Sequence, residues 1–362
     1  MKFLTLFPYY KDIHHKKDVG MIPYIMQKEY GYSCYVACYD IPCNHGKVMF
    51  IKMKQYTNSL AFNVILFLLF NSKKYDILNI YHYCPLSFFA IMLYKLLNPK
   101  GKIFYKLDMD TEDGMKMSMR IGGFKHKVTR QVFGMCDIVS CETDKFREYV
   151  SSKWKINIDY IPNGFIKNNI NLYNEKEKII MTVGRLGTQQ KATEVLVEAF
   201  INSLSSISKN WKLILVGPYT NDFYIWIKKY DIYIGEGRIV LTGLITDDIL
   251  LSQFYDKCSI FTMPSRGESF GIAALEALAH GCYLLLSDLS SFSEMLLTDS
   301  IGELFECDNV DEYSNKITRL CNRLEMKKVN EQYLALYDKI VKKYSWEEIC
   351  KRINCRLIVK SK

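Results

Sequence analysis

The chain has 362 residues, of which 49% are hydrophobic and 24% are charged. This composition excludes a disordered or low-complexity protein and provides apolar side chains for two domain cores of ordinary size. The net charge of +9 is uneven, because residues 1–166 hold 23 Lys and Arg against 14 Asp and Glu, whereas residues 167–362 hold 25 of each. The N-terminal half therefore suits a polyanion, an anionic membrane surface or a phosphate-bearing substrate, or it has a lysine-rich solvated surface.

The first apolar segment, Lys2–Phe7, is interpreted as a buried strand and not as the core of a signal peptide. The 12 cysteines are scattered, which favours reduced thiols in a cytoplasmic protein. Cys34, Cys38, Cys43 and His45 lack the close-paired spacing of a structural zinc site. We therefore interpret these cysteines as buried apolar residues.

Short apolar runs alternate with helical patterns through residues 1–166. The expected strands are Lys2–Phe7, Cys34–Tyr39, Val48–Ile51, Ile77–Tyr81, Lys102–Leu107, Asp137–Cys141 and Ile158–Ile161. Helical patterns include Gly20–Tyr30, Leu60–Asn71, Ser87–Leu97 and Asp144–Ser151. The run Leu60–Phe70 is about half the ~20 residues that a membrane-spanning helix needs. We expect it to pack against a sheet, and a place in a membrane interface is the alternative.

A turn at Ile161–Gly164 leads into a polar stretch, Lys167–Lys178, that we interpret as a linker. Strands are expected again at Ile179–Val183, Lys212–Val216, Ile239–Leu241, Ile260–Met263 and Tyr283–Leu286. This alternation predicts an α/β fold of two doubly wound, Rossmann-like parallel-sheet domains that face each other across a cleft. The expected domains are residues 1–166 and 167–343, followed by a C-terminal helix, 344–362, that packs back on the first domain. Ligands of such sheets bind at the carboxyl ends of the strands.

The strongest chemical pattern is residues 261–281 (FTMPSRGESFGIAALEALAHG). A buried strand ends at Pro264, a loop carries Glu268, and Gly271 opens a helix that contains Glu276. We expect the amides of residues 269–272 to lack intrahelical partners and, with the helix dipole, to favour a diphosphate or a polar sugar. Glu268 could instead cap the helix and Glu276 face solvent. The helix is apolar almost all round, however, so a carboxylate within it needs a partner, which favours a functional role.

A second pattern is residues 181–191 (MTVGRLGTQQK). A buried strand leads into Gly184 and Arg185, and Lys191 follows at the start of a helix. Arginine and lysine at a strand end provide a bidentate fork and a point charge for a diphosphate. Such residues are usually only solvated, so the pattern gains weight from the second anion-binding loop about 80 residues later in the same domain.

These motifs resemble the retaining glycosyltransferases with the GT-B fold, often called group 1. The resemblance rests on Val183–Leu186, Lys191 and Pro264–Ser265, and on Glu268 and Glu276 separated by seven residues. The segments Leu215–Gly217, Val240–Gly243 and Ser345–Glu347 match further family positions. The match covers the C-terminal domain and is weaker over the N-terminal domain, which binds varied acceptors in this family. Departures are Lys191-Ala192 in place of Lys-Gly, and a single glycine, Gly20, where the family often has two.

The resemblance implies roles for individual residues. It assigns Arg185 and Lys191 to the donor diphosphate, Glu276 to the ribose hydroxyls and Glu268 to the hydroxyls of the donor sugar. The other donor-binding candidates are Gly184, Ser269, Phe270, Gly271, Ile272 and Gly20. The family usually needs no divalent metal, so we expect no metal and no cofactor, with a nucleotide-diphosphate sugar as co-substrate. Asp108-Met109-Asp110 spells the D-x-D motif of metal-dependent GT-A enzymes, which we interpret as coincidence because that fold has one nucleotide domain.

Two expected strand ends of the N-terminal domain carry further catalytic candidates. His82 follows the strand Ile77–Tyr81 and resembles the position of an active-site histidine in the family. Asp108 follows the strand Lys102–Leu107. Either side chain could orient the donor sugar or accept the acceptor's proton, as a general base does. The alternative is an ordinary polar residue that closes a strand; it competes evenly with a functional role for His82 and is favoured for Asp108.

The sequence therefore predicts a retaining hexosyltransferase that transfers a sugar from a nucleotide-diphosphate sugar to an acceptor hydroxyl. Its catalytic candidates are Glu268, Arg185, Lys191, His82 and Asp108. We expect the acceptor to be a lipid-diphosphate-linked saccharide in surface polysaccharide synthesis, such as capsule or O-antigen, and the protein to be cytoplasmic and peripheral at the inner face of the cell membrane. An anionic membrane is a further expected partner, and nucleic acid is not. The alternatives are a GT-B phosphorylase or epimerase, and a non-catalytic sugar-nucleotide-binding protein. A phosphorylase would require inorganic phosphate.

Overall fold

The computed structural model describes residues 1–42, 48–109, 123–167, 172, 175–323 and 331–359. Contacts divide the chain into two compact units. The N-terminal unit contains residues 1–164 together with 343–362, and the C-terminal unit contains residues 165–342. The sequence-based boundaries lie at 166/167 and 343/344. Cys43, His45 and Asp110 lie outside the described residues, as does part of the expected linker.

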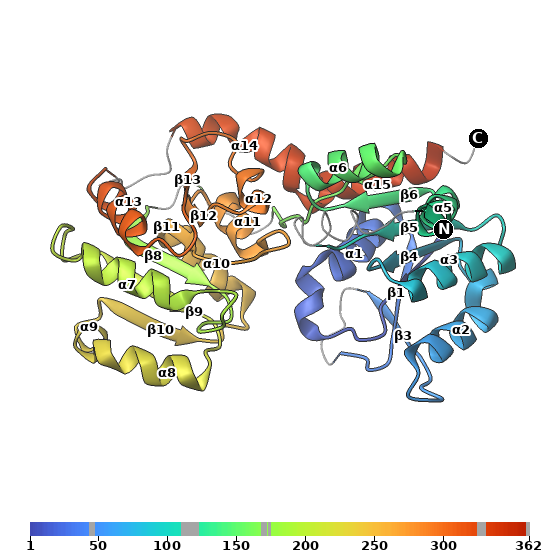
Figure 1. Ribbon diagram of the computed structural model, residues 1–362, viewed down its shortest axis with the longest axis horizontal. Coiled ribbons are helices and arrows are strands. Elements are labelled where there is room, and N and C mark those ends of the chain that lie inside the picture. The colour runs from blue at the N-terminus through green and yellow to red at the C-terminus, as the bar shows by residue number, and fades with distance from the viewer. Residues whose placement is uncertain (43–47, 110–122, 168–171, 173–174, 324–330, 360–362) are drawn as a thin grey trace. The chain divides into compact units, whose positions relative to one another are not determined.

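A seven-stranded sheet forms the centre of the N-terminal unit (Figure 1). Its strands are β1 (Lys2–Leu6), β2 (Ser33–Cys38), β3 (Met49–Lys52), β4 (Ile77–Tyr81), β5 (Lys102–Lys106), β6 (Ile138–Cys141) and β7 (Asp159–Tyr160). Their order is β3-β2-β1-β4-β5-β6-β7, and neighbouring strands are parallel. The strand order reverses between β1 and β4, which is where doubly wound sheets bind ligands.

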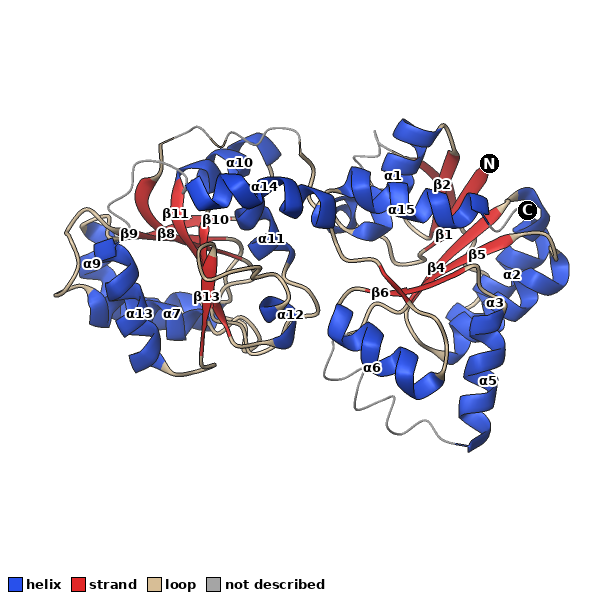
Figure 2. Ribbon diagram, turned by 90° about the horizontal axis from the view of Figure 1, so that it is seen from above, coloured by secondary structure: helices blue, strands red, loops and turns tan. Residues whose placement is uncertain are grey.

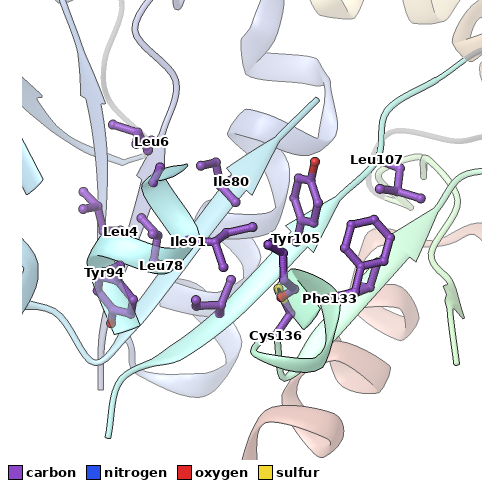
Figure 3. Close-up of a cluster of buried hydrophobic side chains, with 14 of the residues drawn as sticks. Leu4, Leu6, Leu78, Ile80, Ile91, Tyr94, Tyr105, Leu107, Phe133 and Cys136 are labelled. Atoms are coloured by element: carbon purple, nitrogen blue, oxygen red, sulfur yellow. Dashed lines mark hydrogen bonds between the residues drawn. The ribbon is translucent and has the colours of Figure 1, made fainter. Parts of the chain in front are cut away.

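Helices cover both faces of this sheet (Figure 2). One face carries α2 (Leu60–Asn71), α3 (Pro85–Leu97), α5 (Gly123–Gly134) and α6 (Asp144–Trp154), which contribute to one buried cluster with the strands. Figure 3 shows part of this cluster, in which Ile91 and Tyr94 of α3 and Phe133 of α5 lie among side chains of the strands. Burial of such large apolar side chains is the main stabilising contribution in each unit.

The other face carries α1 (Asp18–Tyr30) and the C-terminal helix α15 (Trp346–Val359), which pack against each other. The hydroxyl of Tyr32 donates a hydrogen bond of 2.6 Å to Asn354 Oδ1. Arg356 Nη2 donates to Asp159 Oδ2 at 3.1 Å. The last helix of the chain is therefore part of the N-terminal unit.

A six-stranded sheet, also parallel, forms the centre of the C-terminal unit. Its strands are β8 (Glu177–Val183), β9 (Lys212–Val216), β10 (Ile239–Gly243), β11 (Cys258–Met263), β12 (Tyr283–Ser287) and β13 (Gly302–Phe305), in the order β10-β9-β8-β11-β12-β13. Its helices are α7 (Thr193–Ser203), α8 (Asn221–Ile227), α9 (Asp231–Gly235), α10 (Asp248–Lys257), α11 (Ile272–Ala279), α12 (Ser290–Ser293), α13 (Val310–Arg323) and most of α14 (Glu331–Tyr344). The prediction of two doubly wound parallel-sheet units is confirmed.

Local sequence sets several element ends. Ser59 caps α2 by accepting a hydrogen bond from the amide of Phe62, and Asp247 caps α10 in the same manner. Gly31 ends α1 in the left-handed conformation, at φ 67°. The sequence did not predict β13, because its four residues (GELF) include only two large apolar side chains.

Within the described residues, no helix is both long enough and apolar enough to cross a membrane. The same part of the chain contains no group of three or more His, Cys, Asp or Glu that could hold a metal ion.

Candidate functional site

Three glycines bring neighbouring strand ends of the six-stranded sheet into close contact. The amide of Gly184 donates to Val216 O, and the amide of Gly217 donates to Gly243 O, both at 2.9 Å. Gly217 has φ 133°, and a Cβ atom there would lie 1.9 Å from Gly184 O. Only glycine fits this close approach. The carboxyl edge of β8, β9 and β10 is therefore formed largely by backbone.

The two loops singled out in the sequence lie against each other at this edge. Arg185 Nη2 donates to Gln190 Oε1 at 3.1 Å, within the loop that follows β8. Gln190 Nε2 donates to Gly267 O at 2.8 Å, and the amide of Arg266 donates to Gln190 O at 2.9 Å. The loop after β8 is thus fastened to the loop after β11, although about 80 residues separate them in the chain.

Lys191 and Glu268 form an ion pair between these loops, from Lys191 Nζ to Glu268 Oε1. Both side chains are mostly buried, with exposed fractions of 18% and 10%. Ser265 Oγ donates a second hydrogen bond to the same carboxylate oxygen at 3.1 Å. The sequence predicted separate roles for this lysine and this glutamate, and the structure places them in direct contact. The residue after the lysine, Ala192, is left-handed at φ 46°, a conformation that suits the glycine found there in the family.

Glu276 is held by a tyrosine that sequence reasoning missed. The hydroxyl of Tyr255, on α10, donates to Glu276 Oε2 at 3.0 Å. Complete burial is the main cause that raises the pKa of Tyr255 well above its usual range, and the negative charge of Glu276 is the second cause. The hydroxyl therefore remains a donor. The ring stacks on His280, whose Nδ1 lies 2.6 Å from Asp256 Oδ1. Nothing in one sequence distinguishes Tyr255 from any other buried tyrosine.

Arg266 fixes the loop that carries Glu268, and sequence reasoning missed this residue also. Its Nε donates to both carboxylate oxygens of Asp308, at 2.8 and 3.0 Å. Its Nη2 donates to Glu194 Oε1 at 3.0 Å and its Nη1 to Gln189 O at 2.8 Å. The hydrogen bond with Asp308 is the main cause that raises the pKa of Arg266. The loop is therefore connected to α7 and to the segment before α13.

Helix α11 begins at Ile272, with Gly271 as its N-cap at φ 85°. A Cβ atom on Gly271 would lie 2.4 Å from Phe292 Cε1, so this position also requires glycine. The amides without intrahelical partners are consequently those from Gly271 onward. Ser269 and Phe270, which we expected to be included, lie in the preceding loop, where Ser269 is exposed and the Phe270 side chain is buried.

In the N-terminal unit, the structure brings the two candidates His82 and Asp108 together. They follow the adjacent strands β4 and β5, and His82 Nδ1 lies 3.1 Å from Asp108 Oδ2. Both residues have positive φ angles, 66° and 43°, a conformation that non-glycine residues adopt rarely and that concentrates at functional sites. The hydrogen bond with Asp108 raises the pKa of His82. Burial raises the pKa of Asp108, but the bond to His82 and the charge of Lys106 outweigh it and lower that pKa overall.

A buried charge cluster lies at the same edge of the sheet, and the sequence did not suggest it. Lys106, at the end of β5, has no exposed surface. Its Nζ lies 2.5 Å from Asp18 Oδ2 and 3.0 Å from Glu142 Oε1. Asn163 Nδ2 also donates to Glu142 Oε1, at 2.8 Å. Burial raises the pKa of Glu142 from its usual 4.5 to about 7, against the opposing effect of the Lys106 charge. This carboxyl group therefore stays protonated to a higher pH than an exposed glutamate does.

Gly20, a donor-binding candidate at the start of the expected helix Gly20–Tyr30, lies in the first turn of helix α1. A Cβ atom there would be 2.7 Å from His14 O and 2.8 Å from His15 Cα. The described contacts give Gly20 a packing role between α1 and the preceding 3₁₀ helix, η1 (Asp12–Lys16). A role in donor binding stays a prediction.

Comparisons with known proteins agree with the geometry of the C-terminal unit. Residues 177–323 match the family model described as "Glycosyl transferases group 1". An uncharacterised glycosyltransferase of Methanocaldococcus jannaschii is 27% identical over 257 residues, which are 70% of this chain and 68% of that protein. The phosphatidyl-myo-inositol mannosyltransferase of Mycobacterium tuberculosis is 25% identical over 187 residues, which are 50% of this chain and 47% of that protein. The chain thus spans about half the length of the latter relative.

A solved structure shows the same fold over nearly the whole chain. HepE of Anabaena, in complex with UDP and glucose, superposes with a TM-score of 0.68 at 15% identity and covers 99% of each chain. Two doubly wound parallel-sheet units of this kind define the GT-B fold. Both units together have this fold, and residues 177–323 of the C-terminal unit match the group 1 glycosyltransferases.

Proposed function

We propose that the chain is a retaining glycosyltransferase that transfers a hexose from a nucleotide-diphosphate sugar to an acceptor hydroxyl. The observation that carries the proposal is the pairing of Lys191 with Glu268 at the carboxyl edge of the six-stranded sheet, followed along the chain by Glu276 of α11 with its tyrosine donor. These groups supply a cation for a diphosphate and two carboxylates for sugar hydroxyls. HepE is described in complex with UDP and glucose, which supports a ligand of this class.

The proposed chemistry of the donor half follows from charge. Breaking the bond between sugar and diphosphate places negative charge on the leaving group, and an oxocarbenium-like transition state develops on the sugar. Lys191, Arg185 and the first amides of α11 are preorganised donors for that charge. Glu276 would accept hydrogen bonds from the ribose hydroxyls and Glu268 from those of the donor sugar.

We propose that transfer needs no divalent metal. Arg185 and Lys191 are the cationic groups that would take the place of a metal at the diphosphate. Turnover in excess EDTA should equal turnover in added Mg²⁺ or Mn²⁺. A strict metal requirement would contradict this part of the proposal.

His82 and Asp108 are proposed to act at the reacting sugar. Their contact and their left-handed backbones place two polar side chains, 54% and 31% exposed, at the carboxyl edge of the N-terminal sheet. A histidine with a carboxylate partner can orient a hydroxyl or accept its proton.

The proposed acceptor is a lipid-linked saccharide in the synthesis of a surface polysaccharide, at the inner face of the cell membrane. The relative from Mycobacterium tuberculosis is named as a transferase that acts on a phosphatidyl-inositol, which supports a lipid-borne acceptor. The positive charge of residues 1–166 supports the same class.

The deciding experiment measures donor binding and turnover with matched variants. The protein would be screened by thermal shift against UDP-, GDP- and ADP-sugars, since a ligand of the folded state raises the melting temperature. With the stabilising donor, Glu276→Gln and Arg185→Ala should lower kcat/KM by roughly 100-fold or more, as expected for removal of a preorganised charge partner. Lys212→Ala, exposed at the opposite end of β9, serves as the control and should leave turnover unchanged.

Product analysis separates the alternatives. NMR of the product should show the anomeric configuration of the donor, and inversion would refute the retaining assignment. Dependence on inorganic phosphate would indicate a phosphorylase, and release of an epimerised sugar would indicate an epimerase. Donor binding without turnover on any lipid-linked acceptor, with wild-type behaviour of both variants, would favour a non-catalytic sugar-nucleotide-binding protein.

A further inference from the structure

Two helices of the N-terminal unit leave large apolar side chains in contact with solvent. On α2 these are Phe62, Leu69 and Phe70, and on α3 they are Phe89, Met92 and Leu96; we call the six residues the α2–α3 apolar face. Leu96 is 77% exposed and Phe70 is 72% exposed. Monomeric proteins rarely leave such residues adjacent to one another without a partner.

The helices direct these side chains away from the sheet. Helix α2 buries Val64 and Leu68 against the core, as the sequence predicted for a helix that packs on a sheet. Helix α3 buries Ala90, Ile91 and Tyr94. Phe89, Met92 and Leu96 have helical spacing and lie on the opposite side of α3. The expectation of a packed helix therefore accounts for one side of α2 and leaves the other side unexplained.

The two outward sides form one surface. Helices α2 and α3 pack against each other and cover the same face of the sheet. Figures 1 and 2 both show α2 beside α3. Each helix connects two parallel strands of the sheet, so both helices run in the same direction. Their carboxyl ends therefore lie at the same edge of the helical layer.

Lysines surround that edge, and acidic residues are nearly absent from the segment. Lys73 and Lys74 follow α2 directly, Lys100 follows α3, and all three are exposed. In the sequence, Lys73 and Lys74 follow Phe70 within four residues and Lys100 is four residues after Leu96; Phe70 and Leu96 are the two most exposed members of the apolar face. From Ile41 to Leu107 the sequence contains nine lysines and a single acidic residue, Asp76.

We propose that the α2–α3 apolar face is the surface by which the N-terminal unit docks on an anionic phospholipid membrane. Apolar side chains enter the boundary between headgroups and acyl chains, and the flanking lysines contact phosphates of the lipids. A protein partner would be expected to find polar groups for hydrogen bonds at about one per 100–200 Å². The exposed side chains Phe62, Leu69 and Phe70 of α2 offer no hydrogen-bonding groups. The apolar part of a bilayer requires no such groups.

The position of the face fits a lipid-borne acceptor. Helix α3 begins at Pro85, three residues after His82, and Phe89 lies one turn into the helix. The apolar face therefore starts near the candidate edge and extends away from it along α3. This point rests on the proposed function, whereas docking itself does not.

The test is cosedimentation of the full chain with unilamellar vesicles. Vesicles of about 70% phosphatidylcholine and about 30% phosphatidylglycerol would be compared with pure phosphatidylcholine, since anionic lipid adds attraction for each lysine near the surface. The double variant Phe70→Ser/Leu96→Ser should bind the anionic vesicles at least about 10-fold more weakly, because it removes apolar burial. Changing Lys73, Lys74 and Lys100 to Gln should weaken binding by about fivefold per lysine and remove most of its salt dependence.

A matched control uses exposed isoleucines of the other unit. Ile225 on α8 and Ile232 on α9 are 60% and 67% exposed, and Ile225→Ser/Ile232→Ser should bind vesicles like the unchanged protein. Circular dichroism melts of both double variants should match the unchanged protein, since exposed positions contribute little to stability.

Three results would overturn the proposal. These are absence of binding to anionic vesicles at low salt, equal binding by Phe70→Ser/Leu96→Ser, and vesicle-independent dimerisation that this variant abolishes. The last result would assign the face to a second copy of the chain. Hydrolysis of the donor in solution should be unchanged in Phe70→Ser/Leu96→Ser, so a failure of docking is distinguishable from a failure of the transferase assignment.

Discussion

Replacement of Lys106 by methionine tests the role of the buried charge cluster in the N-terminal unit. The lysine side chain is fully buried, and its Nζ lies between the carboxyl groups of Asp18 and Glu142. Methionine has similar length and no charge, so Lys106→Met leaves two buried carboxyl groups without their cation. Breaking a buried ion pair in this manner costs about 3–5 kcal/mol of unfolding free energy. Domains are stable by only about 5–15 kcal/mol in total, so the loss should be easy to detect.

The assay is equilibrium urea unfolding followed by circular dichroism, with the unchanged protein and Lys106→Met compared at one pH. A triple variant that also carries Asp18→Asn and Glu142→Gln is the matched control. It replaces both carboxyl groups by neutral amides, so it should recover most of the lost stability, since a buried ion cluster can be replaced by neutral groups at little cost. A loss below about 1 kcal/mol in Lys106→Met, which is typical of surface pairs, would refute the assignment of a buried cluster.

The pH dependence of Glu142 provides a second measurement on the same cluster. Burial raises its pKa from 4.5 to about 7, so the folded chain binds this proton more tightly than the unfolded chain does. Its stabilising contribution is therefore complete below pH 4.5 and is lost as the pH rises through about 7, by on the order of 3 kcal/mol. Glu142→Gln lacks this titration, so its stability relative to the unchanged protein should increase between about pH 5 and pH 8. A difference that stays constant with pH would show that Glu142 is ionised throughout.

Three further predictions concern single contacts. Tyr255→Phe removes the hydroxyl that donates to Glu276 and should raise KM for the donor by about 10-fold or more, as expected for a hydrogen bond to a charged group. Steady-state kinetics measure this effect, and an unchanged KM would contradict it. Asp108→Asn removes the main cause of the raised pKa of His82, so the acidic limb of the pH–kcat/KM profile should move to lower pH. An unmoved limb would show that the protonation of His82 does not affect the reaction. Gly217→Ala introduces a Cβ atom 1.9 Å from a backbone carbonyl and should cost about 3 kcal/mol or more in a urea titration, because the backbone must shift.

The sequence predicted the parallel sheets well, because each strand is a short apolar run followed by a helical pattern. The loops that carry Lys191 and Glu268 could be found for the same reason, since carboxyl ends of parallel strands meet at one edge. Their direct ion pair could not be predicted, because it depends on the backbone paths of two loops 77 residues apart.

The residues that the sequence missed share a different property. Lys106 ends a strand, where lysines are usually solvated, and its two partners come from residues 18 and 142. Tyr255 is one of 26 tyrosines and meets Glu276 only after α10 and α11 have packed. In the same manner, His82 and Asp108 were found singly, and their contact required the pairing of β4 with β5.

The ion pair between Lys191 and Glu268 has a consequence for which molecules can occupy the donor half. Without a ligand, the lysine already has an internal counter-ion, so an incoming phosphate must displace a carboxylate that is only 10% exposed. A free phosphate or nucleotide that separates the pair leaves the Glu268 carboxylate without its cation in a poorly hydrated place, where Ser265 still donates to it, which is unfavourable. A complete nucleotide sugar brings a diphosphate for the lysine and hydroxyls for the glutamate at once. The pair therefore discriminates against fragments of the donor, and the affinity gained on joining sugar to nucleotide should exceed the sum of the two parts.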